Sequence, residues 1–129
     1  MSTKAIPQAI QAQVEQIVDQ FNRETFANPA RGYQARFRGR YLYLNRSDTG
    51  EPFQICRLTY TGKMDDWEFA IYRHSKDRYD PDEWFFPGQE KVDGTIVGAM
   101  QAGLLAYPVM QETTLMKFFR AFFRQGRSR

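Results

Sequence analysis

The chain contains few of the residues that carry metal, redox or nucleophilic chemistry. It has one cysteine, Cys56, and one histidine, His74, among 129 residues. A single cysteine cannot form an internal disulfide, which is typical of a reducing compartment, and we therefore expect a cytoplasmic location. The same count excludes a metal site built from several histidines or from Cys and His together within one chain. Because Cys56 falls among apolar strand residues, we expect it to be buried and inert.

Long apolar runs and nucleotide-binding motifs are also missing. No stretch of 18 apolar residues occurs, and the N-terminal segment MSTKAIPQAIQAQ has no continuous apolar core. The sequence therefore predicts neither a transmembrane helix nor a signal peptide. It contains no glycine-rich phosphate loop, no dinucleotide fingerprint and no zinc-protease motif. Nothing here supports an enzyme, and we expect a non-catalytic protein without a cofactor or metal.

The central stretch, residues 52–75, contains two runs that are rich in β-branched and aromatic residues. A polar turn led by Gly62 separates them, and this pattern predicts a β-hairpin. Because side chains alternate along a strand, we expect one buried face made of Cys56, Leu58, Tyr60, Trp67, Phe69 and Ile71. The segments Arg57–Tyr60 and Trp67–Tyr72 resemble the hairpin core of small bacterial proteins of unknown function, and this resemblance implies no activity.

A second hairpin is predicted just before the first. Residues 33–46 alternate around Gly39, which predicts two short strands joined by a tight turn. Four apolar side chains then share the core face: Ala35, Phe37, Leu42 and Leu44. Together the two hairpins give four strands in a meander.

Helices are predicted on both sides of these strands. Apolar residues spaced three and four apart indicate a helix over about residues 7–26, ended by Asn28-Pro29. A second helix is predicted over 95–107, capped by Asp93 and stopped by Pro108. We expect its stripe of small residues to lie against the sheet, with a helix dimer contact as the alternative: Gly94, Gly98, Ala102 and Ala106. Residues 76–94, with several breakers and an apolar plug, are predicted to be irregular and to bury at least one aromatic ring.

These elements predict an α+β domain over residues 1–111. It comprises an N-terminal helix, a four-stranded antiparallel meander sheet and a helix packed on that sheet. The composition, 42% hydrophobic and 16% aromatic, suits one such domain. The element order resembles RNA-recognition and double-stranded-RNA-binding domains. The segment Arg36–Tyr41, however, departs from the aromatic signature of the first class.

The open face of the predicted sheet is the first candidate binding surface. Cations would lie beside aromatic rings there, so that bases could stack on tyrosines while arginines contact phosphates. The residues are Arg36, Arg38, Tyr41, Tyr43, Arg57 and Tyr72. The simpler alternative is that these side chains form ordinary cross-strand pairs on a solvated face, or are covered by another subunit.

The C-terminal segment, residues 112–129, is the second candidate. As a short amphipathic helix it would present an apolar face and a basic one, through Leu115, Lys117, Phe118, Phe119, Arg120, Phe122 and Arg124. An exposed patch of this kind is rare in monomers, and we expect it to pack on its own domain or a second copy. A partner protein and an anionic membrane follow as alternatives.

The sequence thus favours a binding or interaction module without catalytic activity. Protein–protein interaction or self-association is the leading hypothesis, with a homo-oligomer or a protein as the partner. Binding of single-stranded nucleic acid is the alternative. Salt dependence separates the two hypotheses, because phosphate binding weakens steeply as salt is added.

Overall fold

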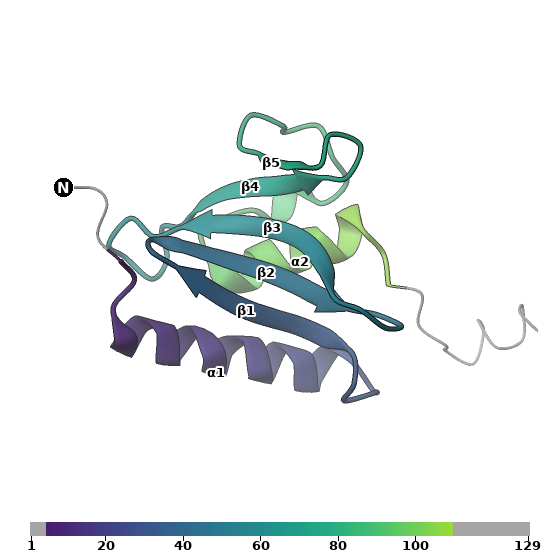
Figure 1. Ribbon diagram of the computed structural model, residues 1–129, viewed down its shortest axis with the longest axis horizontal. Helices are drawn as coiled ribbons and strands as arrows, with labels where there is room; N and C mark the ends of the chain where they lie inside the picture. Colours follow the sequence, from purple (N-terminus) through teal and green to yellow (C-terminus); the bar gives the residue numbers. More distant parts are fainter. Residues whose placement is uncertain (1–4, 110–129) are drawn as a thin grey trace, which may run out of the picture.

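The computed structural model describes residues 5–109, which form an antiparallel sheet with one long helix behind it and the other along its first strand (Figure 1). The α+β class is therefore confirmed. No helix within the described residues is long and apolar enough to cross a membrane. In chain order the elements are α1 (Gln8–Thr25), β1 (Gly32–Arg38), β2 (Tyr41–Ser47), β3 (Phe53–Thr59), β4 (Glu68–Arg73), β5 (Arg78–Asp80), the short 3-10 helix η1 (Gln89–Lys91) and α2 (Ile96–Ala106).

The sheet is a meander in the order β1-β2-β3-β4-β5. It has five strands rather than the predicted four, because the segment predicted to be irregular contributes the short strand β5. The first hairpin closes as expected: Arg38 pairs with Tyr41, and Gly39 occupies the turn with a φ of +61°. A left-handed backbone conformation of this kind costs glycine little. Asp77, at φ 53°, takes the corresponding role before β5.

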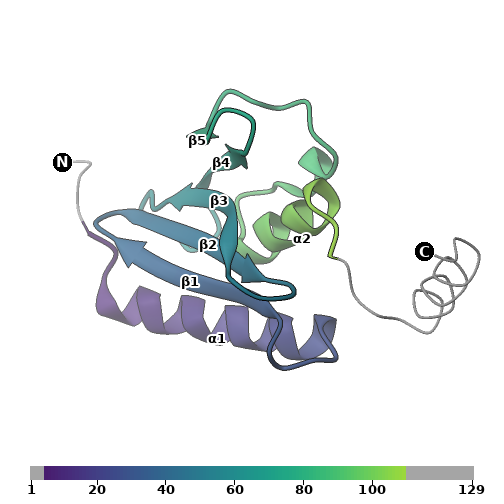
Figure 2. The same cartoon turned by 45° about the vertical axis from the view of Figure 1, so that its right-hand side comes forward.

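The predicted core face of the sheet is confirmed. Leu42, Leu44, Cys56, Leu58, Trp67, Phe69 and Ile71 are all buried, and Ala35 and Phe37 pack half-buried against them. Figure 2 shows α1 beneath β1 and α2 behind the middle of the sheet, so these side chains lie between the sheet and the helices. Burial of this apolar surface is the main favourable contribution to folding.

A β-bulge interrupts the alternation in β3. The register shifts between Leu44 and Asn45, since Leu44 pairs with Cys56 and Asn45 pairs with Gln54. The extra residue, Ile55, is fully buried next to Cys56, whereas strict alternation would place it on the opposite face. The bulge also brings Gln54 beside Asn45.

Helix α1 agrees with its predicted range to within a residue and closes one edge of the sheet. The amide of Asn22 donates to the carbonyl of Tyr33 at 2.9 Å and accepts from the Tyr33 backbone N–H at 2.9 Å. The Asn22 side chain therefore bonds the backbone N–H and C=O of Tyr33 at the edge of β1, as a neighbouring strand would. Covering a strand edge in this way limits pairing with other chains.

Helix α2 corrects two expectations. Its N-cap is Thr95, whose hydroxyl accepts from the Gly98 N–H at 2.9 Å, while the predicted cap Asp93 accepts from Thr95. Gly98 does lie at a close backbone contact, but its partner is not the sheet: a Cβ there would stand 2.5 Å from the Lys91 carbonyl. The small-residue stripe therefore faces the η1 segment.

The sheet contact of α2 is made by Gly103. A Cβ at this position would stand 2.4 Å from the Tyr33 hydroxyl and 2.5 Å from Cγ2 of Ile55. The bulged residue Ile55 thus fits where the helix has no side chain.

A fully buried cation, Arg46, joins β2 to the C-terminal end of α2. It forms an ion pair with Asp48 at 2.8 Å and donates to the carbonyls of Gly103, at 3.3 Å, and Tyr107. Cations are favoured at helix C-termini, where carbonyls lack helical partners. Beside it, the hydroxyl of Tyr33 donates to the Met100 carbonyl at 2.6 Å. Burial raises the pKa of this phenol, which keeps it a donor at neutral pH.

The segment after β5 contains the aromatic plug expected from the sequence. Phe86 stacks on Phe69, with ring centroids 5.8 Å apart, and Trp84 lies 6.2 Å from the same ring. Phe85, between them, points outward and is 92% exposed. The plug therefore extends the core over β4, while the ring of Phe85 and part of Trp84 remain in solvent.

Candidate functional site

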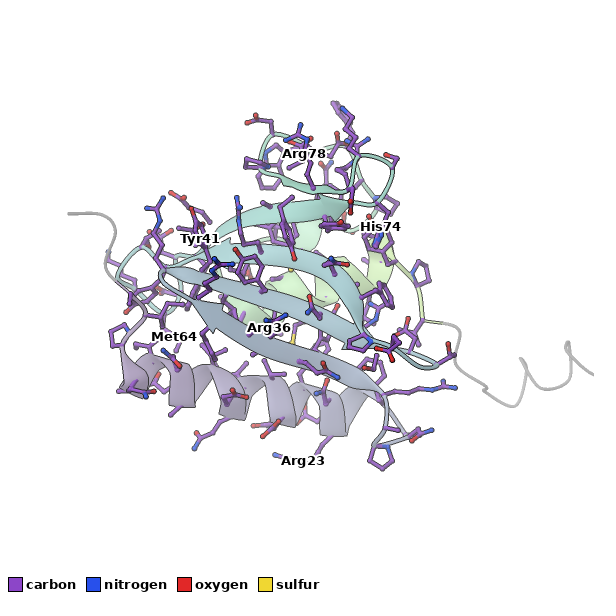
Figure 3. All side chains as sticks on the ribbon, in the orientation of Figure 1. Arg23, Arg36, Tyr41, Met64, His74 and Arg78 are labelled. Carbon is purple, nitrogen blue, oxygen red and sulfur yellow. The ribbon has the colours of Figure 1, made fainter. Side chains whose placement is uncertain are left out.

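The open face of the sheet places cations and aromatic rings in adjacent cross-strand positions. Arg36 of β1 pairs with Tyr43 of β2, which pairs with Arg57 of β3. Arg38 pairs with Tyr41 one step nearer the hairpin turn. Figure 3 shows Arg36 and Tyr41 over the strands, on the side of the sheet away from α2. Neither long helix covers this face.

Tyrosine rings form a continuous series across the same face. The centroids of Tyr41 and Tyr43 lie 6.1 Å apart, those of Tyr43 and Tyr79 lie 5.4 Å apart, and Tyr79 contacts Tyr72 at 4.8 Å. The guanidinium of Arg57 lies 4.7 Å from the Tyr41 centroid and 5.5 Å from that of Tyr79. Such cation–π contacts fix the guanidinium in place without consuming its N–H donors.

The arginines of this face differ in how they are held. Arg36 and Arg38 are exposed, and neither side chain forms an ion pair or hydrogen bond with another described residue. Arg57 is half-buried between its tyrosines. Two acids lie near these arginines: Glu68 shares the face by strand phase, opposite Thr59, and Asp77 accepts from the hydroxyl of Tyr72. The face is therefore positively charged.

Three of these four tyrosines have shifted pKa values, and the hydrogen bond with Asp77 raises the pKa of Tyr72. The hydrogen bond from Arg40 and the nearby positive charge of Arg40 lower the pKa of Tyr41. Burial raises the pKa of Tyr79 to about 12, so that this phenol remains protonated at neutral pH. Neutral rings of this kind suit the stacking of bases, which every base can provide through its π face.

Tyr72 differs from the other five residues predicted for this surface. It is 5% exposed, and its hydroxyl donates to Asp77. Its backbone carbonyl accepts from the hydroxyl of Tyr107. Tyr72 is therefore a buried cross-strand neighbour of Tyr79, and Tyr79 is the ring that a ligand on this face would meet.

A shallow depression of about 270 Å³ lies within this face. Its lining comes mainly from β1, β2 and the bulged part of β3, with Tyr79 from β5: Arg36, Phe37, Arg38, Tyr43, Asn45, Gln54 and Tyr79. The binding residues predicted from the sequence for this face did not include Asn45, Gln54 or Tyr79. A signal for Tyr79 was available in the sequence: turn residues, Ser75 to Asp77, separate Tyr72 from Tyr79, which is the pattern of a hairpin.

The remaining candidates for chemistry do not form a site. Within residues 5–109, no group of three or more His, Cys, Asp or Glu side chains is placed to hold a metal ion. Cys56 is fully buried, and burial raises the pKa of its thiol. His74 is exposed, with its Nε2 3.2 Å from the Gln54 carbonyl and its ring against Tyr107.

The interaction segment predicted near the C-terminus lies outside the described residues. This applies to Leu115, Lys117, Phe118, Phe119, Arg120, Phe122 and Arg124.

Comparison with known proteins adds no assignment: no family model, no curated protein and no solved structure matches the chain.

Proposed function

We propose that the open face of the sheet binds single-stranded nucleic acid. The observation that carries this proposal is that the exposed guanidinium groups of Arg36 and Arg38, which have no partner among residues 5–109, lie beside a series of tyrosine rings on an uncovered sheet face. Phosphates would meet the arginines while bases stack on Tyr41, Tyr43 and Tyr79. A paired duplex would not expose its base faces to such a surface.

The test is a titration of short fluorescent single-stranded oligonucleotides into the full chain at several salt concentrations. We expect binding that weakens with salt, and a double variant Arg36→Ala/Arg38→Ala that binds less tightly. Loss of two phosphate contacts should also reduce the slope of log K against log salt by about 1.4. Both side chains are exposed, so the variant should fold normally.

A matched control removes the same charge elsewhere. Arg23 in α1 and Lys91 in η1 are exposed and lie off the open face, so Arg23→Ala/Lys91→Ala should leave affinity and slope nearly unchanged. The proposal fails if the wild-type chain does not bind at low salt, or if both double variants lose affinity equally. It also fails if an acidic polypeptide binds as tightly as the oligonucleotide.

The interaction module expected from the sequence is the second candidate function. The supporting observation is the exposure of two adjacent aromatic residues, with Phe85 92% and Trp84 44% exposed. If this corner is a contact for another protein copy, Phe85→Ser should reduce self-association in light scattering over a range of concentrations. A wild-type chain that stays monomeric throughout would contradict this candidate.

A further inference from the structure

Two side-chain atoms on the open face are shielded from solvent yet have no hydrogen-bond partner among the described residues. They are Oδ1 of Asn45, which lines the depression, and Nε of Arg57, whose guanidinium contacts Tyr79 on its wall. Buried polar atoms are nearly always paired in folded proteins, so each exception calls for a specific explanation. Here one atom is an acceptor and the other a donor.

The bulge explains why the pair occurs at this place. Because Ile55 turns into the core, Gln54 becomes the cross-strand partner of Asn45, and the regular ladder is disturbed beside it. Arg57 lies on the far side of the bulge, opposite Tyr43. Bulges commonly redirect side chains next to functional sites.

The two unpaired atoms discriminate between ligands. A phosphate group offers acceptors to Arg57 but nothing that donates to Oδ1 of Asn45, and a metal ion would be repelled by the arginines. The edge of a nucleobase carries donors and acceptors side by side, and its face is flat. The depression is slightly smaller than pockets for drug-sized ligands, which suits a single nucleotide unit.

We infer that this depression seats one base of the bound strand, an inference that rests on the proposed function. The base lies against the ring of Tyr43. Oδ1 of Asn45 and Nε of Arg57 have almost no exposed surface and Arg57 is not part of the lining, so both side chains turn towards the base on binding. Asn45 then accepts a hydrogen bond from the base and Arg57 donates one to it. Arg36 and Arg38, on its rim, contact the neighbouring phosphates. The depression therefore recognises a base, whereas Arg36 and Arg38 on its rim recognise the phosphate backbone of the strand.

Replacing Asn45 with leucine tests the seat, because Leu has a similar size and cannot form a hydrogen bond. Removing an unpaired buried oxygen should leave the melting temperature unchanged or raised. Affinity for oligonucleotides carrying bases should fall about tenfold, the effect of one lost hydrogen bond. Affinity for a chain of abasic sugar phosphates of the same length should not change.

The control is Gln34→Leu, which removes an amide on the same face directly opposite Asn45. Gln34 already donates to the Ser47 hydroxyl at 2.8 Å and does not line the depression, so we expect no loss of base-dependent affinity. Arg57→Lys is a second test variant that keeps the charge but loses the Nε donor. It should weaken binding of base-containing chains while the salt slope stays constant.

The two proposals fail in different ways. If Asn45→Leu and Arg57→Lys bind base-containing chains as tightly as wild type, the seat is refuted while strand binding stands. If wild type binds abasic and base-containing chains equally, both the seat and the stacking of bases on the tyrosines are refuted, and only phosphate binding by the arginines stands. If wild type binds neither chain at low salt, the proposed function itself is wrong.

Discussion

Arg46 connects the sheet to the end of α2, and replacing it with methionine should destabilise the fold severely. The side chain is 0% exposed, and its loss would leave the Asp48 carboxylate without its partner at 2.8 Å. The carbonyls of Gly103 and Tyr107 would also lose a buried donor. Removing one partner of a buried ion pair costs about 3–5 kcal/mol, a large fraction of the stability of a domain this size.

Urea unfolding, followed by tryptophan fluorescence through the buried Trp67, measures this loss. The double variant Arg46→Met/Asp48→Leu removes both charges and should recover part of the stability, because no unpaired carboxylate remains. Arg46→Lys should lie between wild type and Arg46→Met, since an ammonium keeps the charge without the planar fork. A loss below about 1 kcal/mol for Arg46→Met, the level of an exposed ion pair, would refute the role assigned to Arg46.

Three further predictions follow from the packing and the titrating groups. Gly103→Ala should destabilise the fold by about 1–3 kcal/mol in the same urea assay, because the new Cβ would collide with Ile55 and with the hydrogen-bonded Tyr33 hydroxyl. Gln101→Ala, on the exposed side of α2, serves as the control. The pKa of Tyr79 rises from 10.0 to about 12, so the folded state keeps a proton that the unfolded chain has lost. The contribution of Tyr79 to stability should be complete below pH 10 and be lost towards pH 12 in thermal melts, in addition to losses from Tyr33 and Cys56. An equal decline in Tyr79→Phe would contradict this assignment. Truncation after residue 111 should lower the melting temperature or convert an oligomer to a monomer, whereas an unchanged protein would identify the removed segment as a recognition tail.

The core of the sheet could be predicted because alternation alone determines it. Ala35, Phe37, Leu42 and Leu44 follow the period of a strand on both sides of Gly39, and the structure places all four towards the helices. A register slip of one residue would move this whole set into solvent, so the pattern specifies a single pairing.

At Arg46, the alternation of the strand and the charge of the side chain predict opposite locations. Arg46 follows Leu42 and Leu44 at the same two-residue spacing, so alternation places it in the core. Its charge favours the surface instead, because buried arginines are rare. What makes its burial acceptable is a set of partners distant in sequence, at the end of α2, which no local pattern reveals.

The bulge and β5 were beyond local inference for related reasons. Ile55 and Cys56 are consecutive apolar residues, and only the pairing with β2 decides which of them departs from the alternation. Strand β5 has three residues, too few for a period to be visible, and it forms because β4 presents an edge to it. The Gln54 and Tyr79 walls of the candidate site depend on these two features, which is why the sequence predicted the open face but not the depression.

The residues that stabilise the fold and the residues proposed to bind nucleic acid lie on opposite faces of the same strands. Substitutions on the open face can therefore test binding without unfolding the protein. Residues pointing towards the helices, such as Leu44 and Arg46, are buried, and changing them should unfold the protein. Arg36 and Arg38 on the other face are exposed, and exposed substitutions usually change stability by no more than about 0.5 kcal/mol. Any loss of nucleic-acid affinity in their variants would therefore reflect the surface itself and not a loss of fold.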